Sequence, residues 1–229
     1  MVKANLNRIK ERIVRACSRI NREPESITIV AVSKNRTVEE IREAIEAGIG
    51  NIGENRVKEA LSKYNNLRLN TYDLGQIKWH MVGHLQSNKA KDAVELFDLI
   101  HSVDSLKLAG EINKQAQKID KIQEILIEVN TSGESSKYGF KPEEAIAAVK
   151  DLIAFKNIDL KGLMTIAPIV DNPQGARPYF KMLRELRDQI RNLRITTYDL
   201  QLSMGMTDDF AEAVEEGADI IRLGRLIFE

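Results

Sequence analysis

Short apolar runs alternate with helical patterns along the whole of this 229-residue chain. The first run, 27–32, is rich in β-branched residues and shows no polar face, as expected for a strand buried on both sides of a parallel sheet. Strands alternating with helices indicate βαβ units, and eight such units close into a (β/α)8 TIM barrel of the α/β class. The seven further strands are predicted at 51–53, 79–82, 99–102, 124–129, 160–166, 199–203 and 219–223.

Helical patterns separate most of these strands. At 3–21, one stripe predicts a helix with one buried face. Its residues are Leu6, Ile9, Ile13, Val14, Cys17 and Ile20. The sequence ends about six residues after the last predicted strand, so we expect this N-terminal helix to pack on the barrel wall in place of a last outer helix, within one domain over 1–229. The remaining helices are predicted at 37–48, 54–64, 87–95, 105–119, 142–155, 174–192 and 207–216, with long irregular connections at 65–77 and 131–141.

Charge and cysteine content exclude several classes of function. Lys plus Arg and Asp plus Glu both number 34, so the basic excess of a nucleic-acid-binding domain is missing. No apolar run approaches the roughly 20 residues that span a bilayer, and the N-terminus lacks the apolar core of a secretion signal. The one cysteine, Cys17, fits a reducing compartment. We therefore expect a cytoplasmic protein, a monomer or weak dimer, with no nucleic-acid or membrane partner.

Lys34 is the most informative residue at the predicted carboxyl ends of the strands, where barrels carry their functional sites. It follows the first strand directly, so its stem should start near the barrel interior. Partial burial would lower the pKa of its ammonium, and a neutral lysine amine can form a Schiff base with an aldehyde. The alternative is a lysine that keeps its charged end in water at a strand end.

Two neighbouring turns carry the signature of a phosphate site. Ser203 and Gly205 follow the seventh predicted strand, and Arg222, Gly224 and Arg225 end the eighth. Helix N-termini after these strands commonly bind phosphate in barrels of this kind. Ordinary tight turns with a serine cap are the alternative.

A metal site is not expected. His80 and His84 flank Gly83 without helical spacing, and neither a cysteine nor a carboxylate nearby completes a ligand set. His80 and His101 are predicted to be packed strand residues.

Seven segments carry motifs that occur together in one known family, at 31–34, 53–57, 79–89, 101–104, 162–164, 202–206 and 221–224. In this order they resemble the pyridoxal phosphate homeostasis proteins, also called the YggS/PROSC family, which are similar in fold to the barrel domain of alanine racemase. The resemblance implies that Lys34 holds pyridoxal 5′-phosphate as an aldimine. It also implies that Ser203, Gly205, Gly224 and Arg225 surround the phosphate, that Arg222 approaches the pyridine nitrogen, and that Asn55 lies at the cofactor edge.

An arginine at the pyridine nitrogen favours a binding protein over a fast catalyst. Its fixed cation disfavours protonation of that nitrogen, and a neutral pyridine is a weaker electron sink. We therefore expect a protein that buffers the cofactor or delivers it to apoenzymes, with no catalytic residue. The alternative is a fold type III amino-acid racemase or weak lyase, which needs a second base such as Tyr138 from 131–141. A third possibility is a barrel for another phosphorylated metabolite, with Lys34 acting only through its charge.

Overall fold

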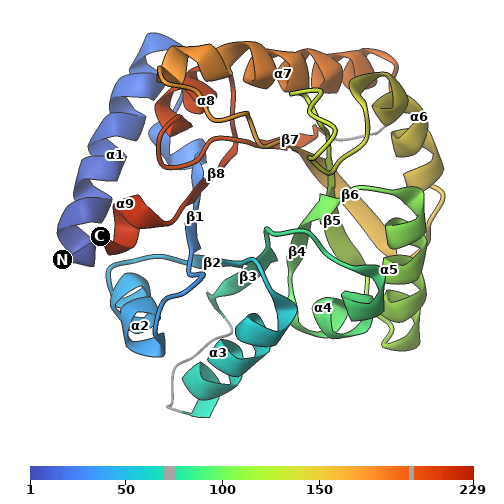
Figure 1. Ribbon diagram of the computed structural model, residues 1–229, viewed down its shortest axis with the longest axis horizontal. Coiled ribbons are helices and arrows are strands. Elements are labelled where there is room, and N and C mark those ends of the chain that lie inside the picture. Colours follow the sequence, from blue (N-terminus) through green and yellow to red (C-terminus); the bar gives the residue numbers. More distant parts are fainter. Residues whose placement is uncertain (70–75, 196–198) are drawn as a thin grey trace.

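Eight parallel strands close into a barrel in the order β1 to β8 in the computed structural model, which describes residues 1–69, 76–195 and 199–229 (Figure 1). The closure is a parallel pairing of β1 with β8, in which Thr28 faces Ile220 and Val30 faces Arg222. The predicted fold class is therefore confirmed. The strands are β1 Thr28–Val32, β2 Asn51–Glu54, β3 Lys78–Met81, β4 Leu99–Val103, β5 Gln123–Glu128, β6 Ile158–Met164, β7 Gln201–Ser203 and β8 Ile220–Leu223.

Helices form a ring outside the barrel (Figure 1). They are α1 Val2–Arg19, α2 Val38–Glu46, α3 Val57–Leu69, α4 Ala90–Leu96, α5 Leu106–Lys118, α6 Pro142–Leu152, α7 Arg177–Asn192, α8 Phe210–Glu215 and α9 Arg225–Phe228, with short 3-10 turns η1 Pro24–Ser26, η3 Ser87–Lys89 and η4 Pro173–Ala176. Across the described ranges, the structure has no helix that is both long and apolar enough to cross a membrane.

The connection predicted at 65–77 is partly wrong, because α3 continues to Leu69. Leu67 is fully buried, so its packing holds the last turns of the helix despite their polar neighbours. Residues 70–75 of that connection lie outside the described residues, as do 196–198 before β7. The connection at 131–141 is irregular as predicted.

The N-terminal helix α1 packs on the barrel wall between α8 and α2, beside the single turn of α9 (Figure 1). Its buried face contains Leu6, Ile9, Ile13 and Cys17 of the predicted stripe. The prediction was wrong for Val14 and Ile20, which are exposed because they lie at the edge of the apolar face and beyond the end of the helix. Asn5 Nδ2 also donates a hydrogen bond of 3.1 Å to the carbonyl oxygen of Ile227, which joins α1 to α9. The helix thus covers the sector of the barrel next to β8 and β1.

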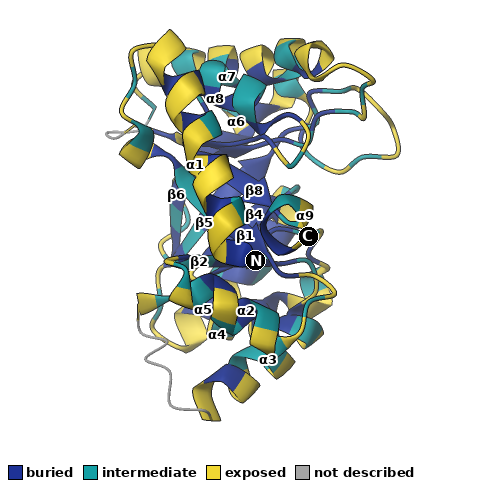
Figure 2. Ribbon diagram, turned by 90° about the vertical axis from the view of Figure 1, so that its left-hand side faces the viewer, coloured by how far each residue is buried: buried dark blue, intermediate teal, exposed yellow. Residues whose placement is uncertain are grey.

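The apolar core has two layers, seen as the dark-blue strands inside the exposed helices in Figure 2. The larger layer lies between the strands and the helices, and the smaller one fills the barrel interior. Gly53 belongs to that interior, because a Cβ there would lie 2.8 Å from Val30 Cγ1. The apolar side chains of the interior are Val30, Val32, Val82, Leu99, Leu126, Met164 and Ile220.

Candidate functional site

Lys34 lies two residues beyond β1, in a turn at the carboxyl-end mouth of the barrel. It has the same parity as Val30 and Val32, whose side chains fill the interior, so its stem starts on the inner side of the wall. Asn35 follows with φ 60°, a left-handed conformation that turns the chain outward. Lys34 is exposed, so the structure does not show the partial burial expected for its ammonium. The strand ends before the lysine, and the turn lifts the amine above the interior.

A buried ion pair holds the backbone next to Lys34. The carbonyl oxygen of Ser33 accepts hydrogen bonds from Arg36 N at 3.0 Å and from Lys63 Nζ at 2.6 Å. Lys63 Nζ also lies 2.6 Å from Glu54 Oε1, which accepts the Ser33 hydroxyl at 2.5 Å. The Glu54 side chain is fully buried. This support was not predicted, because it joins residues of three elements that lie between 9 and 30 positions apart in the sequence.

Arg222 is a buried cation in the barrel interior, with 4% of its surface exposed. Its Nη1 donates to Ser203 Oγ at 2.6 Å, and its Nη2 donates to the carbonyl oxygen of Thr165 at 2.8 Å. Burial lowers the pKa of the guanidinium to about 10, against the opposing effects of Asp209 and Glu128. Arg222 is therefore still charged at neutral pH.

Ser203 ends β7 with its hydroxyl directed into the interior. The residue is fully buried, and its Oγ lies 2.9 Å from His101 Nδ1 as well as 2.6 Å from Arg222 Nη1. A hydroxyl has one hydrogen and two acceptor positions. Two interior partners therefore occupy the Ser203 side chain, and any contact it makes with phosphate would use the backbone.

The two predicted phosphate turns lie side by side, since Arg222 N donates to the carbonyl oxygen of Gly205 at 3.0 Å. Gly205 has φ +91°, and a Cβ there would lie 2.5 Å from Ala213 Cβ, so packing of α8 alone requires glycine. Gly224 caps α9, whose first N–H groups have no partner within the helix. Arg225 is exposed and donates to Asp208 Oδ2 at 2.8 Å.

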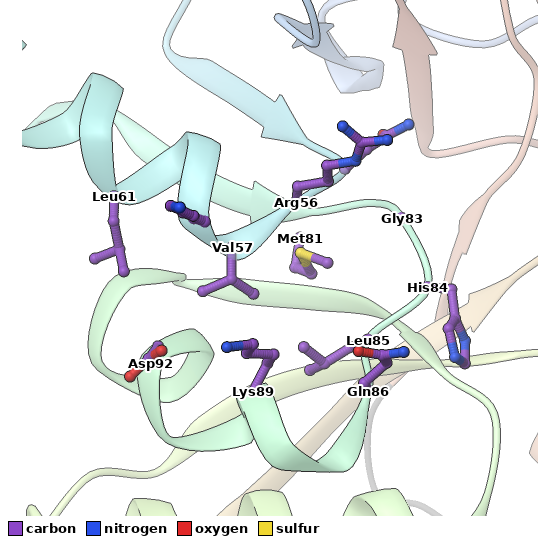
Figure 3. Close-up of a pocket in the computed structure, with 12 residues that line it drawn as sticks. Arg56, Val57, Leu61, Met81, Gly83, His84, Leu85, Gln86, Lys89 and Asp92 are labelled. Atoms are coloured by element: carbon purple, nitrogen blue, oxygen red, sulfur yellow. The ribbon is translucent and has the colours of Figure 1, made fainter.

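Asn55 is half-buried beside the mouth, next to the turn at Gly83, where a Cβ would come within 2.5 Å of the Asn55 carbonyl oxygen. Both residues line a cavity of about 590 Å³ between α3 and the η3–α4 segment. In Figure 3, Val57 of α3 points across this cavity toward Lys89 and Leu85, and Leu61 points toward the turn that carries Asp92. Much of the motif at 79–89 thus lines the cavity beside the mouth.

His80 and His101 are buried in β3 and β4, as predicted. Burial lowers the pKa of His80 to about 3, and burial with the nearby His80 and Arg222 brings the pKa of His101 well below its ordinary value. Both rings are therefore neutral at physiological pH. Within the described part of the chain, no group of His, Cys, Asp and Glu side chains could hold a metal ion.

The part of the mouth that follows β3 to β5 carries a pair of stacked rings. Tyr138, from the connection at 131–141, stacks on His84 with ring centroids 3.6 Å apart. His84 Nδ1 lies 3.1 Å from Asp104 Oδ2 after β4. Glu128, at the end of β5, is buried, and this burial together with Asp104 raises the pKa of its carboxyl to about 7.

Residues 4–229 match the family model of the alanine racemase N-terminal domain. The pyridoxal phosphate homeostasis protein of Aquifex aeolicus is 43% identical over 226 residues, covering 97% of this chain and 95% of that protein. The chain belongs to the pyridoxal phosphate homeostasis protein family. The crystal structure of a Bifidobacterium adolescentis protein matches with a TM-score of 0.92 at 36% identity, covering 99% of this chain and 94% of that one. PipY of Synechococcus elongatus, solved with PLP bound, matches with a TM-score of 0.82 at 36% identity, covering 96% and 100%.

In this member of the pyridoxal phosphate homeostasis protein family, three neighbouring strands supply most of the predicted site. Barrel closure places β8 between β7 and β1. Lys34, Arg222 and Gly224 therefore share one sector of the mouth with Gly205, whereas Asn55 follows β2 on the other side of β1. Ser203 lies in the same sector but below the mouth.

Proposed function

We propose that this protein binds pyridoxal 5′-phosphate covalently on Lys34 and takes part in PLP homeostasis in the cytoplasm, by buffering the cofactor or delivering it to apoenzymes. The observation that carries the proposal is the pairing of β8 with β1, which brings Lys34, Arg222 and Gly224 together. PipY, 36% identical and solved with PLP bound, supports it, as do the names of the curated relatives.

The residues of this sector fit the chemical groups of the cofactor. The aldehyde requires an amine, and Lys34 offers an exposed one. The phosphate requires N–H donors and positive charge, which the first turn of α9 and the exposed Arg225 supply. The pyridine nitrogen requires a hydrogen-bond donor, and Arg222 uses only two of its five N–H groups in the bonds described above. When bound, the cofactor supplies a reactive aldehyde and a pyridine ring.

Arg222 also supports binding rather than rapid catalysis. It is buried, charged and fixed by two hydrogen bonds, so a ring nitrogen facing it stays unprotonated and draws electrons weakly. The racemase alternative needs a second acid/base group, and its candidate Tyr138 has its ring stacked on His84. We therefore treat racemisation as an outcome to be measured.

Absorbance and borohydride trapping test the attachment. Wild-type protein mixed with pyridoxal phosphate should develop a near-visible absorbance band, and borohydride should fix the label on the peptide that contains Lys34. Lys34→Ala should lose the band. Lys58→Ala, which removes another exposed lysine beside the barrel mouth, should keep it. The same band in Lys34→Ala would show that the assignment of Lys34 is wrong, and no band in wild type would favour a different phosphorylated ligand.

Two activity measurements separate a carrier from a racemase. The loaded protein should activate an apo-aminotransferase and should protect the cofactor from an aldehyde scavenger. A chirality-sensitive assay with L- or D-alanine should show no steady turnover. Turnover that is lost in Tyr138→Phe would favour the racemase alternative, and failure of both transfer and protection would remove the carrier role.

A further inference from the structure

A chain of hydrogen-bonded polar side chains crosses the barrel interior beneath the proposed site. It joins Arg222 of β8 to Ser203 of β7, then to His101 of β4, His80 of β3 and Asn51 of β2. The separations are 2.6 Å from Arg222 Nη1 to Ser203 Oγ, 2.9 Å from Ser203 Oγ to His101 Nδ1, 2.9 Å from His101 Nε2 to His80 Nδ1, and 3.0 Å from His80 Nε2 to Asn51 Oδ1. We call these five residues the interior chain.

The two ends of the interior chain fix the direction of its hydrogens. At one end, the Arg222 guanidinium can only donate, so Ser203 Oγ accepts from it. At the other end, Asn51 Oδ1 can only accept, so His80 donates from Nε2. A neutral imidazole has one N–H, so His80 Nδ1 accepts from His101 Nε2. His101 Nδ1 is then an acceptor, and the Ser203 hydroxyl donates to it.

The opposite direction leaves a buried hydrogen without a partner. If Asn51 presented its amide N–H to His80, each imidazole would reverse, and His101 Nδ1 would donate to Ser203 Oγ. Ser203 would then accept from both His101 and Arg222, and its own hydrogen would have no acceptor in the described parts of the molecule. A buried hydroxyl hydrogen that meets no acceptor destabilises the arrangement that leaves it unpaired. The first direction satisfies every group in the chain.

We propose that Ser203, His101 and His80 are positioning residues for Arg222, linked by hydrogen bonds that all run from Arg222 to Asn51. Because the Ser203 hydroxyl gives its hydrogen to His101, its oxygen faces Arg222 only as an acceptor, and Arg222 presents its remaining N–H groups toward the mouth. The Ser203 hydroxyl and the Thr165 carbonyl oxygen hold the two terminal nitrogens of the guanidinium, Nη1 and Nη2. The role of Arg222 toward a pyridine nitrogen rests on the proposed function, but the direction of the chain does not.

Histidine tautomers test the direction without any ligand. The sequence has only three histidines, so a long-range ¹H–¹⁵N spectrum of the histidine-labelled protein is simple to assign with a His84→Gln variant. His80 and His101 should both appear as neutral Nε2–H tautomers at pH 7. Charged groups facing the pair are Lys78 and Arg222, which also oppose a third positive charge there. An Nδ1–H tautomer or an imidazolium at either residue would overturn the proposed direction.

Ser203→Ala tests the positioning role, with Ser102→Ala as the matched control. Both serines are fully buried on barrel strands, but Ser102 lies outside the interior chain. Ser203→Ala should weaken binding of pyridoxal phosphate roughly 5- to 10-fold, as expected for loss of one hydrogen bond to a charged group. It should also shift the dependence of the bound cofactor's absorbance on pH, because Arg222 loses an anchor.

Ser102→Ala should leave both the affinity and the absorbance profile as in wild type. Equal behaviour of the two variants would overturn the positioning role, even if the tautomers are as expected. If wild-type protein binds no pyridoxal phosphate, the proposed function fails, and the spectrum of the ligand-free protein still decides whether the interior chain runs as described.

Discussion

Glu128 ends β5 with a buried carboxyl group whose pKa is raised to about 7, chiefly by burial. The folded state therefore binds a proton that the unfolded state releases near pH 4.5, so this carboxyl costs stability as the pH rises from about 4.5 to 7. Glu128→Gln should be more stable than wild type at pH 8, by roughly 2–3 kcal/mol, and similar to it below pH 4.5. Urea unfolding at several pH values measures this difference.

The exposed Glu143 of α6 provides the control. Glu143→Gln should stay within about 0.5 kcal/mol of wild type at every pH. A Glu128→Gln variant that is less stable than wild type at pH 8 would show that the Glu128 carboxylate is needed beside Arg222 in the folded protein.

Gly162 of β6 is required by the neighbouring strand. A Cβ there would lie 2.0 Å from the carbonyl oxygen of Gln201 in β7, and a backbone atom cannot move aside as a side chain can. Gly162→Ala should therefore cost about 3 kcal/mol or more, measured by urea unfolding. Gly110→Ala is the matched control, since it lies inside α5 with its nearest contact 3.9 Å away and should add about 0.5–1 kcal/mol. A tolerated Gly162→Ala would contradict this packing of β6 against β7.

At the scale of single residues, the sequence was sufficient to identify candidate residues but not the side chains that surround them. Lys34 was predicted from the apolar run before it, yet its exposure depends on the outward turn at Asn35. The bond between His80 and His101 joins residues 21 positions apart on different strands, so it follows only from the register of the closed barrel. Periodicity detects which side of a strand is buried, and it carries no information on polar partners across the interior.

At the scale of elements, α1 stabilises the barrel through one apolar face. Ile13 is buried against the wall, whereas its neighbour Val14 is 50% exposed. Ile13→Ala should therefore cost about 2–4 kcal/mol, and Val14→Ala should stay within about 0.5 kcal/mol of wild type. Chemical denaturation of the two variants under one condition measures the contrast. Equal losses would mean that α1 contributes through helix propensity rather than through packing.

The elements themselves were largely predictable, because both periodicities are strong in this chain. All eight strands lie within about two residues of their predicted positions, and α2 begins one residue after its predicted start at Thr37, which caps it together with Glu40. α3 was predicted too short, because its last turns are polar in sequence and are held by the buried Leu67. Boundaries of this kind depend on tertiary packing, which local pattern does not contain.

At the scale of the whole molecule, the barrel interior is divided between apolar and polar layers. Apolar side chains such as Val30 and Leu126 lie beside the interior chain that runs from Arg222 to Asn51. A polar interior is stable only when its groups are paired, so the fold and the proposed site depend on the same hydrogen bonds. Low pH should therefore unfold the protein by protonating the buried histidines of this interior.

The pKa of His80 is lowered to about 3 and that of His101 is also depressed, so both imidazoles take up protons near pH 6.5 only when the protein unfolds. Because the folded-state pKa is depressed, the two histidines do not reduce the free energy of unfolding above about pH 6.5. As the pH falls from there toward 3, that free energy decreases by up to about 1.4 kcal/mol per pH unit for each histidine. Urea unfolding from pH 8 to pH 4 should show this slope in wild type. A His80→Gln/His101→Gln variant should be less stable at pH 8 but should lose less stability on acidification, because it lacks two of the groups that take up protons. Parallel pH curves for the two proteins would mean that carboxylates alone govern the acid limb and that the buried histidines do not remain neutral in the folded barrel.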